Sequence, residues 1–387
     1  MKRLHLIYVI AVLLGLVGCI EPPLHLPGQE TTIEMEVAQT ELNLVWDNEI
    51  QLDHEWYYGW DIKDDSIWGG IAYPMPKSYE VYRYYKGDDP NNKHASVDMF
   101  TIDTNRFRRY FQFGYYDMLL YSNIESEDGT QVLVIKESGD SVIATTTGTR
   151  GISRSILDAS RADNNETPLG MLNQPEIFFA AYSENVYISP NLNDYVYDPV
   201  ENIYIKHIEA ELRPLVYIYL VQFVLLNNED GRIKGINGNT AISSMASATD
   251  VKTGHTSSTP SLVYFNTRMK ENIMVEGKPC SVFGGKLTTF GLCDNEPYNR
   301  SSSEYKGGRG DLKNKVYFDL VWNNNKVKTY DADVTSQMQA NSHGGVITVW
   351  IDCAQLTPPE GGDDSGSGSL FIPTLEDYDE VQWNIEI

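Results

Sequence analysis

Short stretches in which apolar and polar residues alternate constrain the fold of this chain most strongly. Residues 32–38 put Ile33, Met35 and Val37 on one side of the chain and glutamates on the other, and residues 381–387 alternate in the same way. A period of two is typical of a strand with one buried face, because successive side chains of a strand point to opposite faces. Helical periodicity is scarce. The sequence therefore predicts an all-β fold.

Further strand candidates are spread along the whole chain and are separated by turn-forming residues. They lie at 42–46, 78–85, 97–101, 110–113, 116–123, 130–136, 203–208, 215–226, 262–266, 286–290, 316–322 and 346–351. The chain also has 25 Tyr, 12 Phe and 7 Trp, and aromatic residues favour strands. Short strands between such turns predict antiparallel β-sandwiches.

The N-terminus carries an export signal. A short cationic start precedes an apolar run at 6–17, which is too short to span a bilayer permanently. The run ends in Leu-Val-Gly-Cys19, which resembles the lipobox cleaved by the lipoprotein signal peptidase. We predict that 1–18 is a signal peptide and that Cys19 carries the acyl chains (palmitate among them) of a mature lipoprotein. The alternative is an ordinary signal peptide with a chance cysteine.

The mature chain is long enough for two domains. Residues 19–30 contain three prolines and read as a lipidated, extended tether. We expect an N-terminal β-sandwich at 31–185 and a C-terminal β-sandwich at 200–387, joined by a turn-rich linker at 190–199. The polar stretch at 150–172 reads as a long loop with one helical turn.

The charge of the chain excludes one class of partner. The formal net charge is −24, and a polyanion of this size repels nucleic acid and an anionic membrane surface alike. We therefore expect no nucleic acid partner, and attachment to the membrane through lipid rather than through charge. The excess of acidic residues serves solubility.

Several phrases, taken in order, carry a resemblance to a known family. They are Leu-Val-Trp at 44–46, Gly-Tyr-Tyr-Asp-Met-Leu-Leu-Tyr-Ser-Asn at 114–123, Pro-Glu-Ile-Phe-Phe-Ala at 175–180, the small-residue run 233–258, and the segments 286–292 and 333–335. In this order they resemble the fimbrillin-like lipoproteins of Bacteroidales, in the Bacteroidetes, the group that contains the anchor subunits of fimbriae.

The resemblance implies a fold and a function. The family folds as two β-sandwich domains of transthyretin-like topology, and its members assemble by donor-strand exchange, a form of β-augmentation. We therefore expect an outer-membrane lipoprotein that faces the cell exterior, takes part in cell adhesion, and anchors or caps a fimbria by pairing with a fimbrial subunit. We place the accepting groove in the C-terminal domain, because the apolar strands 215–226 and 381–387 need covering. The alternative is that 381–387 closes its own sheet.

Other candidate sites have simpler alternatives. Cys280 and Cys293 could form a disulfide, although an odd number of cysteines remains after lipidation and unpaired buried thiols are common. Ser66 and Ser141, in Asp-Ser-Ile and Asp-Ser-Val, resemble the O-glycosylation motif of Bacteroidetes but also fit chance. No spacing of cysteines and histidines suits a metal, so we expect neither metal nor cofactor.

Catalysis finds little support in the sequence. It lacks the Gly-x-Ser-x-Gly elbow, the His-Glu-x-x-His motif and a phosphate-binding loop, so we expect no catalytic residues and no enzyme. Trp56, Tyr58, Trp60 and Trp68 suit stacking on sugars as well as core packing. The rival function is therefore a surface glycan-binding lipoprotein, and a glycoside hydrolase is the third choice. Exposed coplanar rings favour glycan binding, and buried rings favour packing.

Overall fold

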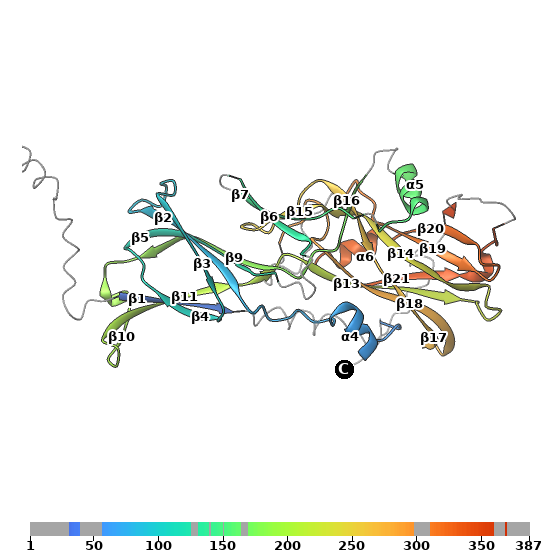
Figure 1. Cartoon of the computed structure of the whole chain (residues 1–387), viewed down its shortest axis with the longest axis horizontal. Coiled ribbons are helices and arrows are strands. Elements are labelled where there is room, and N and C mark those ends of the chain that lie inside the picture. The colour runs from blue at the N-terminus through green and yellow to red at the C-terminus, as the bar shows by residue number, and fades with distance from the viewer. Residues whose placement is uncertain are drawn as a thin grey trace, which may run out of the picture.

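The computed structural model describes residues 31–38, 56–124, 131–138, 141–149, 151–163, 169–297, 310–359 and 368–369. Strands dominate these ranges, and the expected all-β sandwich fold is confirmed. Figure 1 shows an elongated molecule, with β2, β3 and β5 toward one end and β17 to β20 toward the other. Within the described residues no helix is long and apolar enough to cross a membrane.

Two sheets form the N-terminal half, in the orders β10-β11-β1-β4 and β12-β9-β5-β2-β3. Their strands are β1 (Thr31–Ala38), β2 (Tyr79–Gly87), β3 (Ser96–Ile102), β4 (Arg106–Arg109), β5 (Gly114–Ser122), β9 (Phe179–Ile188), β10 (Val196–Asp198), β11 (Ile203–Glu211) and β12 (Arg213–Pro214). A shared core joins Ala210 of the first sheet to Val81, Met118 and Leu120 of the second. The strand β1 lies between β11 and β4, parallel to β11 and antiparallel to β4.

The stretch expected as a linker contains regular structure. It holds the 3₁₀ helix η1 (Leu192–Asp194) and the short strand β10, which pairs with β11. The strand β11, which the sequence placed at the start of the second domain, pairs with β1 over eight positions. The domain bounds themselves stay a prediction.

Two further sheets form the C-terminal half, in the orders β17-β18-β13-β21 and β22-β20-β19-β14-β16-β8. Their strands are β8 (Gly170–Leu172), β13 (Tyr217–Leu226), β14 (Ile233–Ala246), β16 (Pro260–Phe265), β17 (Arg268–Val275), β18 (Lys278–Thr289), β19 (Lys315–Trp322), β20 (Val327–Asp333), β21 (Gly345–Asp352) and β22 (Gly368–Ser369). The core between the two sheets contains Phe223, Phe318 and Trp322. The 3₁₀ helix η2 (Cys353–Gln355) follows β21.

The strand β13 explains the longest apolar run of the sequence. Tyr219 and Phe223 face the core of the C-terminal sandwich, whereas Leu220 and Val224 pack on the opposite face of the sheet. A strand buried on both faces reads as continuously apolar. The neighbours β18 and β21 hydrogen-bond to both edges of β13. The groove that the sequence placed beside this strand is therefore already filled, and residues 381–387 lie outside the described residues.

A three-stranded ribbon, β15-β7-β6, lies between the two halves. Its strands are β6 (Leu133–Ser138), β7 (Ser141–Thr146) and β15 (Ala248–Asp250). The expected loop at 150–172 instead contains a helix of ten residues, α5 (Arg154–Asp163). Ile156 of this helix packs against Leu262 and Tyr317 of the sheet, and the hydroxyl of Ser153 donates to the carboxylate of Asp319 at 3.0 Å. Packing and hydrogen bonds to the sheet make this helix longer than the single turn that we expected.

Candidate functional site

The aromatic segment that suggested sugar binding is largely part of the core. Trp56 and Tyr58 are buried, with exposed fractions of 5% and 1%. Trp60 and Trp68 are half-buried; their ring centroids lie 5.6 Å apart and their planes are tilted by 41°. Because Trp56 and Tyr58 are buried and the rings of Trp60 and Trp68 are not coplanar, the segment favours core packing over stacking on a sugar.

These residues belong to a segment, 56–77, that we call the strap. Its helix α4 (Ile62–Trp68) begins because Asp61 accepts hydrogen bonds from the backbone of Lys63 and Asp64, a capping arrangement. It ends at Gly69, whose φ of 69° suits glycine. Figure 1 shows α4 beside the sheet that contains β13 and β18. The Asp61–Asp64 spacing and the Gly69-Gly70 pair were signals that the sequence analysis did not use.

A buried carboxylate fastens the strap to the strand β17. Asp64 has no exposed surface, and it accepts hydrogen bonds from the Tyr58 hydroxyl, Arg268 Nη1 and Lys270 Nζ, each at 2.8 Å. Lys270 Nζ also lies 4.0 Å from the centroid of the Tyr58 ring. Burial, together with the hydrogen bond to Asp64, raises the pKa of Tyr58. Two cations and a hydroxyl therefore compensate the charge of the buried Asp64, and the same two cations also pair with the half-exposed Asp61, at 3.2 and 3.1 Å.

The strap fits closely against the sheet. A Cβ atom on Gly284 of β18 would lie 2.3 Å from Tyr58 Cγ, so only glycine leaves room for the ring. Lys286 Nζ donates to the carbonyl oxygens of Trp68 at 3.1 Å and Gly70 at 2.6 Å. Burial lowers the pKa of Lys286 to about 8. The strap thus covers the outer face of this sheet from Tyr58 to Gly70.

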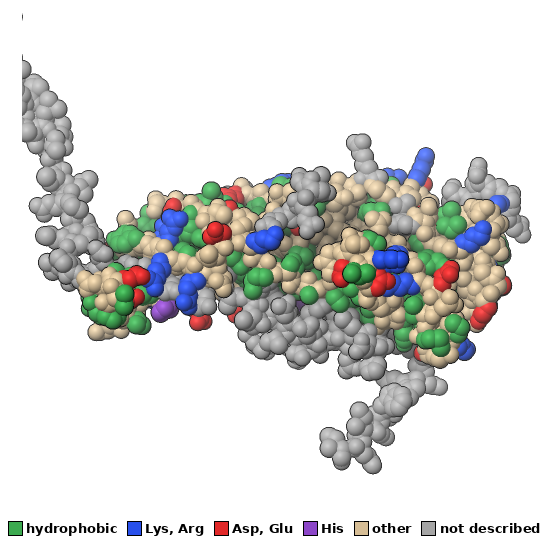
Figure 2. Space-filling view, turned by 60° about the horizontal axis from the view of Figure 1, so that its bottom comes forward, with side chains coloured by type: hydrophobic (Ala, Val, Ile, Leu, Met, Phe, Trp, Pro, Cys, Tyr) green, Lys and Arg blue, Asp and Glu red, His purple; other side chains and the backbone are tan. Residues whose placement is uncertain are grey.

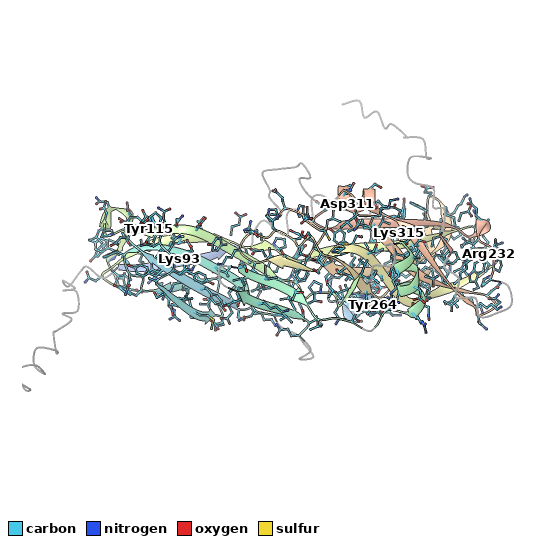
Figure 3. The ribbon with its side chains drawn as sticks, turned by 90° about the horizontal axis from the view of Figure 1, so that it is seen from above. Lys93, Tyr115, Arg232, Tyr264, Asp311 and Lys315 are labelled. Carbon is cyan, nitrogen blue, oxygen red and sulfur yellow. The ribbon has the colours of Figure 1, made fainter. Side chains whose placement is uncertain are left out.

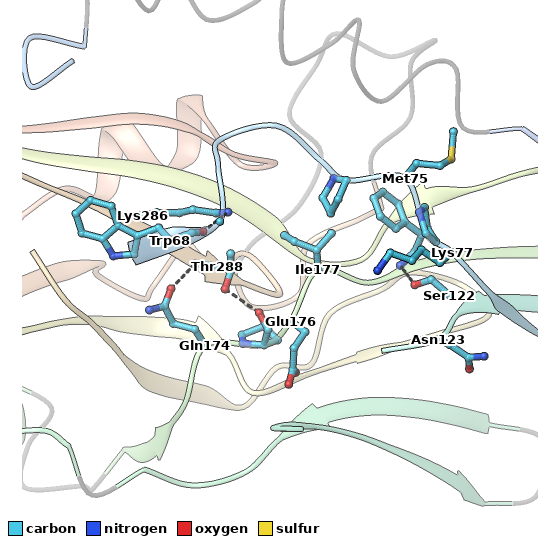
Figure 4. A pocket seen from close by; sticks show the side chains of 15 residues that line it. Trp68, Met75, Lys77, Ser122, Asn123, Gln174, Glu176, Ile177, Lys286 and Thr288 are labelled. Carbon is cyan, nitrogen blue, oxygen red and sulfur yellow. Dashed lines mark hydrogen bonds between the residues drawn. The ribbon is translucent and has the colours of Figure 1, made fainter. Parts of the chain in front are cut away.

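A pocket of about 570 Å³ lies where the two halves meet (Figure 4). Its polar side chains mostly bond to the protein itself. Gln174 Oε1 accepts a hydrogen bond from the Thr288 amide at 2.8 Å, and the Thr288 hydroxyl donates to the Pro175 carbonyl at 2.7 Å. The carboxylate of Glu176 accepts hydrogen bonds from the backbone amides of residues 132 and 133. These bonds join the halves and leave few groups for a ligand.

The remaining candidate residues lie apart from one another. Cys280 and Cys293 are buried in different core clusters, and the structure does not join them by a disulfide. Ser66 is exposed on α4 and donates to the Lys63 carbonyl, and Ser141 is half-buried at the start of β7. Cys19 lies outside the described residues. Within the described residues, no group of three or more His, Cys, Asp or Glu side chains could hold a metal.

Most edge strands of the sheets are short or covered. The edge strands β4, β8, β10, β12, β15 and β22 have two to four residues each. The longer β21 is closed by Gln337 of α6 (Thr335–Ala340), whose side-chain amide bonds both backbone groups of Thr348, at 2.8 and 2.9 Å. The edge strand β6 carries Lys136 and Glu137. Such features keep an edge from pairing with another chain.

The edge strand β3 has none of these features. It pairs with β2 over seven positions without a register shift, and no other strand of the described residues pairs with it. Val97 and Met99 are 55% and 57% exposed on one face. Its one charged side chain, Asp98, is bound by Arg83. A regular edge with exposed apolar side chains has the features that favour strand addition in general.

Charge does not mark a separate site on the surfaces shown. Figure 2 shows acidic and basic side chains in small groups of both signs. Seen from above in Figure 3, Tyr115 lies toward the end of the N-terminal half and Arg232 lies at the opposite end. This mixture differs from the continuous basic face of a nucleic acid interface.

Comparisons with known proteins give structural matches alone. No protein-family model and no curated protein matches the sequence. A proposed adhesin from Bacteroides ovatus has 13% sequence identity and a TM-score of 0.45, covering 89% of this chain and 94% of that chain. Proposed polysaccharide-binding proteins from Bacteroides thetaiotaomicron give 9% identity, a TM-score of 0.42 and coverages of 85% and 94%. The fimbrial anchor protein Mfa2 from Porphyromonas gingivalis has 13% sequence identity and a TM-score of 0.38, and the match covers 83% of this chain and 90% of that chain.

Proposed function

We propose that this chain is a cell-surface lipoprotein that anchors or caps a fimbria by accepting a strand of a partner subunit at the edge of β3. The observation that carries the proposal is the regular, unbulged edge of β3 with its exposed Val97 and Met99. An added strand would gain main-chain hydrogen bonds along β3, and alternate side chains would cover the two apolar residues.

Two features of the sequence support the same function. The motif that ends in Cys19 fits lipid attachment, and the ordered phrases of the fimbrillin-like lipoproteins extend over most of the mature chain. Lipid would hold the chain in the outer membrane, facing the cell exterior. Strand pairing would hold the partner without a covalent bond, and slow dissociation would suit one anchor per filament.

The test replaces Val97 and Met99 together by lysine in the organism that carries the gene. We expect fimbriae to be released into the medium, because lysine on an edge opposes strand addition. The control replaces Met274 and Val327 by lysine. These two residues lie on other strands and are 62% and 41% exposed. Fimbriae that stay attached to cells of the β3 variant, at normal surface abundance of the lipoprotein, would contradict the proposal.

Lipid attachment has its own test. The Cys19→Ser variant should lack acyl chains and remain a soluble or unprocessed precursor, because the signal peptidase acts only on the acylated cysteine. Intact-mass measurement of the wild-type protein checks this directly. A mature protein that begins at another residue, without lipid, would contradict it.

The structure offers fewer observations in favour of the alternative function, glycan binding. Trp56 and Tyr58 are buried, and the bonds of Gln174 and Thr288 at the pocket are used within the chain. Binding of the purified protein to a glycan array, together with unchanged attachment of fimbriae in the β3 variant, would favour this function instead.

A further inference from the structure

A positive charge lies beside the middle of the β3 edge. The guanidinium carbon of Arg109, in the neighbouring strand β4, lies 4.1 Å from the ring centroid of Phe100 in β3. Phe107 of β4 contacts the same ring edge-on, with the centroids 5.4 Å apart. The short turn between β3 and β4 thus joins the edges of the two N-terminal sheets. The contact between Phe100 and Arg109 links the same two edges.

Arg109 differs from the second arginine at this ring. Arg83 lies 5.2 Å from the Phe100 centroid, but its guanidinium is bound to the Asp98 carboxylate and to the Tyr110 carbonyl. Arg109 is exposed and has no ion pair within the described residues. A guanidinium stays charged at every physiological pH. As far as the described residues go, its charge is therefore left for a partner.

We propose that the strand accepted at β3 alternates apolar and acidic residues, and that one of its carboxylates pairs with Arg109. This inference rests on the proposed function. A side chain opposite Phe100 in an added strand lies on the same face of the sheet, with its Cβ about 5 Å from that of Phe100, so a glutamate there reaches Arg109. Side chains opposite Val97 and Met99 lie on the other face and meet apolar surface.

Two observations favour a partner strand of alternating apolar and acidic residues at the edge of β3. The chain's own strand β1 is of the same kind, and its register sets Glu34 and Glu36 opposite Arg108 and Arg106 of β4. A second copy of this chain fits less well, because each copy carries a net charge of −24 and would repel the other.

The test uses two blocked peptides, Thr-Val-Glu-Val-Glu-Val-Thr and Thr-Val-Lys-Val-Lys-Val-Thr, and the full mature protein. We expect the acidic peptide to bind the wild-type protein at least about threefold more tightly than the basic one, the range for a partly exposed ion pair. The Arg109→Glu variant should reverse this preference. The control Arg161→Glu, on α5, should leave it unchanged, and Val97→Lys with Met99→Lys should abolish binding of both peptides.

Three outcomes would overturn the inference. One is an unchanged preference for the acidic peptide in Arg109→Glu. Another is binding of neither peptide to the wild-type protein. The third is a dimer, seen by light scattering, that Met99→Lys dissociates, because the occupant would then be a second copy. Each of them leaves the proposed function to its own test, the release of fimbriae from cells that carry the β3 variant.

Discussion

The edge strands β17 and β3 have nearly the same length but opposite surroundings. The strand β17 has eight residues and a register shift between Lys270 and Ile273, where Asn272 adopts a φ of 58°. Its Arg268 and Lys270 are bound to the strap through Asp64. The strand β3 has seven residues, no register shift, and no covering element among the described residues.

This difference shows that the closure of β17 depends on residues from a distant part of the sequence. The acid that fixes β17 comes from α4, more than two hundred positions earlier in the chain. The corresponding charge at β3, Arg109, comes from the next strand and points to no carboxylate of the described residues. The bulge and the buried charges oppose pairing at β17, whereas β3 has neither feature within the described residues.

Among the changes that test this difference between β17 and β3, removing the carboxylate of Asp64 should have the largest effect. Asp64→Asn removes the buried partner of Arg268 and Lys270, which then keep only the more exposed Asp61, and we expect the free energy of unfolding to fall by about 3 kcal/mol. Urea denaturation measures it. The control Asp65→Asn changes an exposed neighbour, whose carboxylate accepts a hydrogen bond from the Trp60 indole, and should cost less than about 1 kcal/mol. Equal losses in the two variants would show that Asp64 does not fasten the strap.

The fit of the strap gives the next largest effect. Gly284→Ala places a methyl group against the ring of Tyr58, and overpacking of this kind costs about 1–3 kcal/mol. Gly235→Ala, where a Cβ atom meets nothing within 4 Å, is the matched control in a strand of the same half. Limited proteolysis should cut residues 56–77 faster in the first variant. Resistance equal to that of the control would contradict the close contact.

A smaller effect is expected at the third long edge, β21. Gln337→Ala removes the side-chain amide that bonds the backbone of Thr348, and the loss of hydrogen bonds at a partly buried site costs about 1 kcal/mol. Gln339→Ala, on the same helix, is the control and should change thermal stability little. If both variants melt alike, the amide of Gln337 does not close the edge.

The smallest expected effect concerns pH. Because burial lowers the pKa of Lys286 to about 8, below its usual value near 10.4, the unfolded chain binds more protons than the folded chain above pH 8. The lysine's contribution therefore makes the protein more stable as pH rises from about 7.5 to 8.5, by less than about 1 kcal/mol. Urea denaturation at the two pH values should show this rise in the wild-type protein and a smaller one in Lys286→Met. An equal rise in both would assign it to other groups.

Several strands could be placed from the sequence because their pattern is local. The strands expected at 97–101 and at 316–322 coincide with β3 and β19. The strand expected at 110–113 was wrong: this stretch is a loop in which the carbonyls of Tyr110 and Phe113 accept hydrogen bonds from Arg83 and Tyr85. Side chains of a neighbouring strand hold the loop, and no pattern within the four residues reveals them.

The candidate site was less accessible to sequence reasoning than the fold. Trp56 and Tyr58 were interpreted as a sugar platform or as core, and only their contacts decide between the two, because an aromatic ring suits either. The acid at position 64 is one of 54 acidic residues. Its burial follows from two cations that β17 brings to it, a partnership across the whole chain.

The sequence by itself determined that this chain is built from short strands, because side-chain alternation depends on the order of neighbouring residues alone. It also carries the motif that ends in Cys19. Only the tertiary structure decided which strands are central and which are edges. An edge is defined by the absence of a neighbour, and neighbours such as β18 and β21 beside β13, or the strap beside β17, come from distant parts of the chain. The open edge of β3 is a property of the assembled sheet, and the seven residues of the strand do not encode it alone.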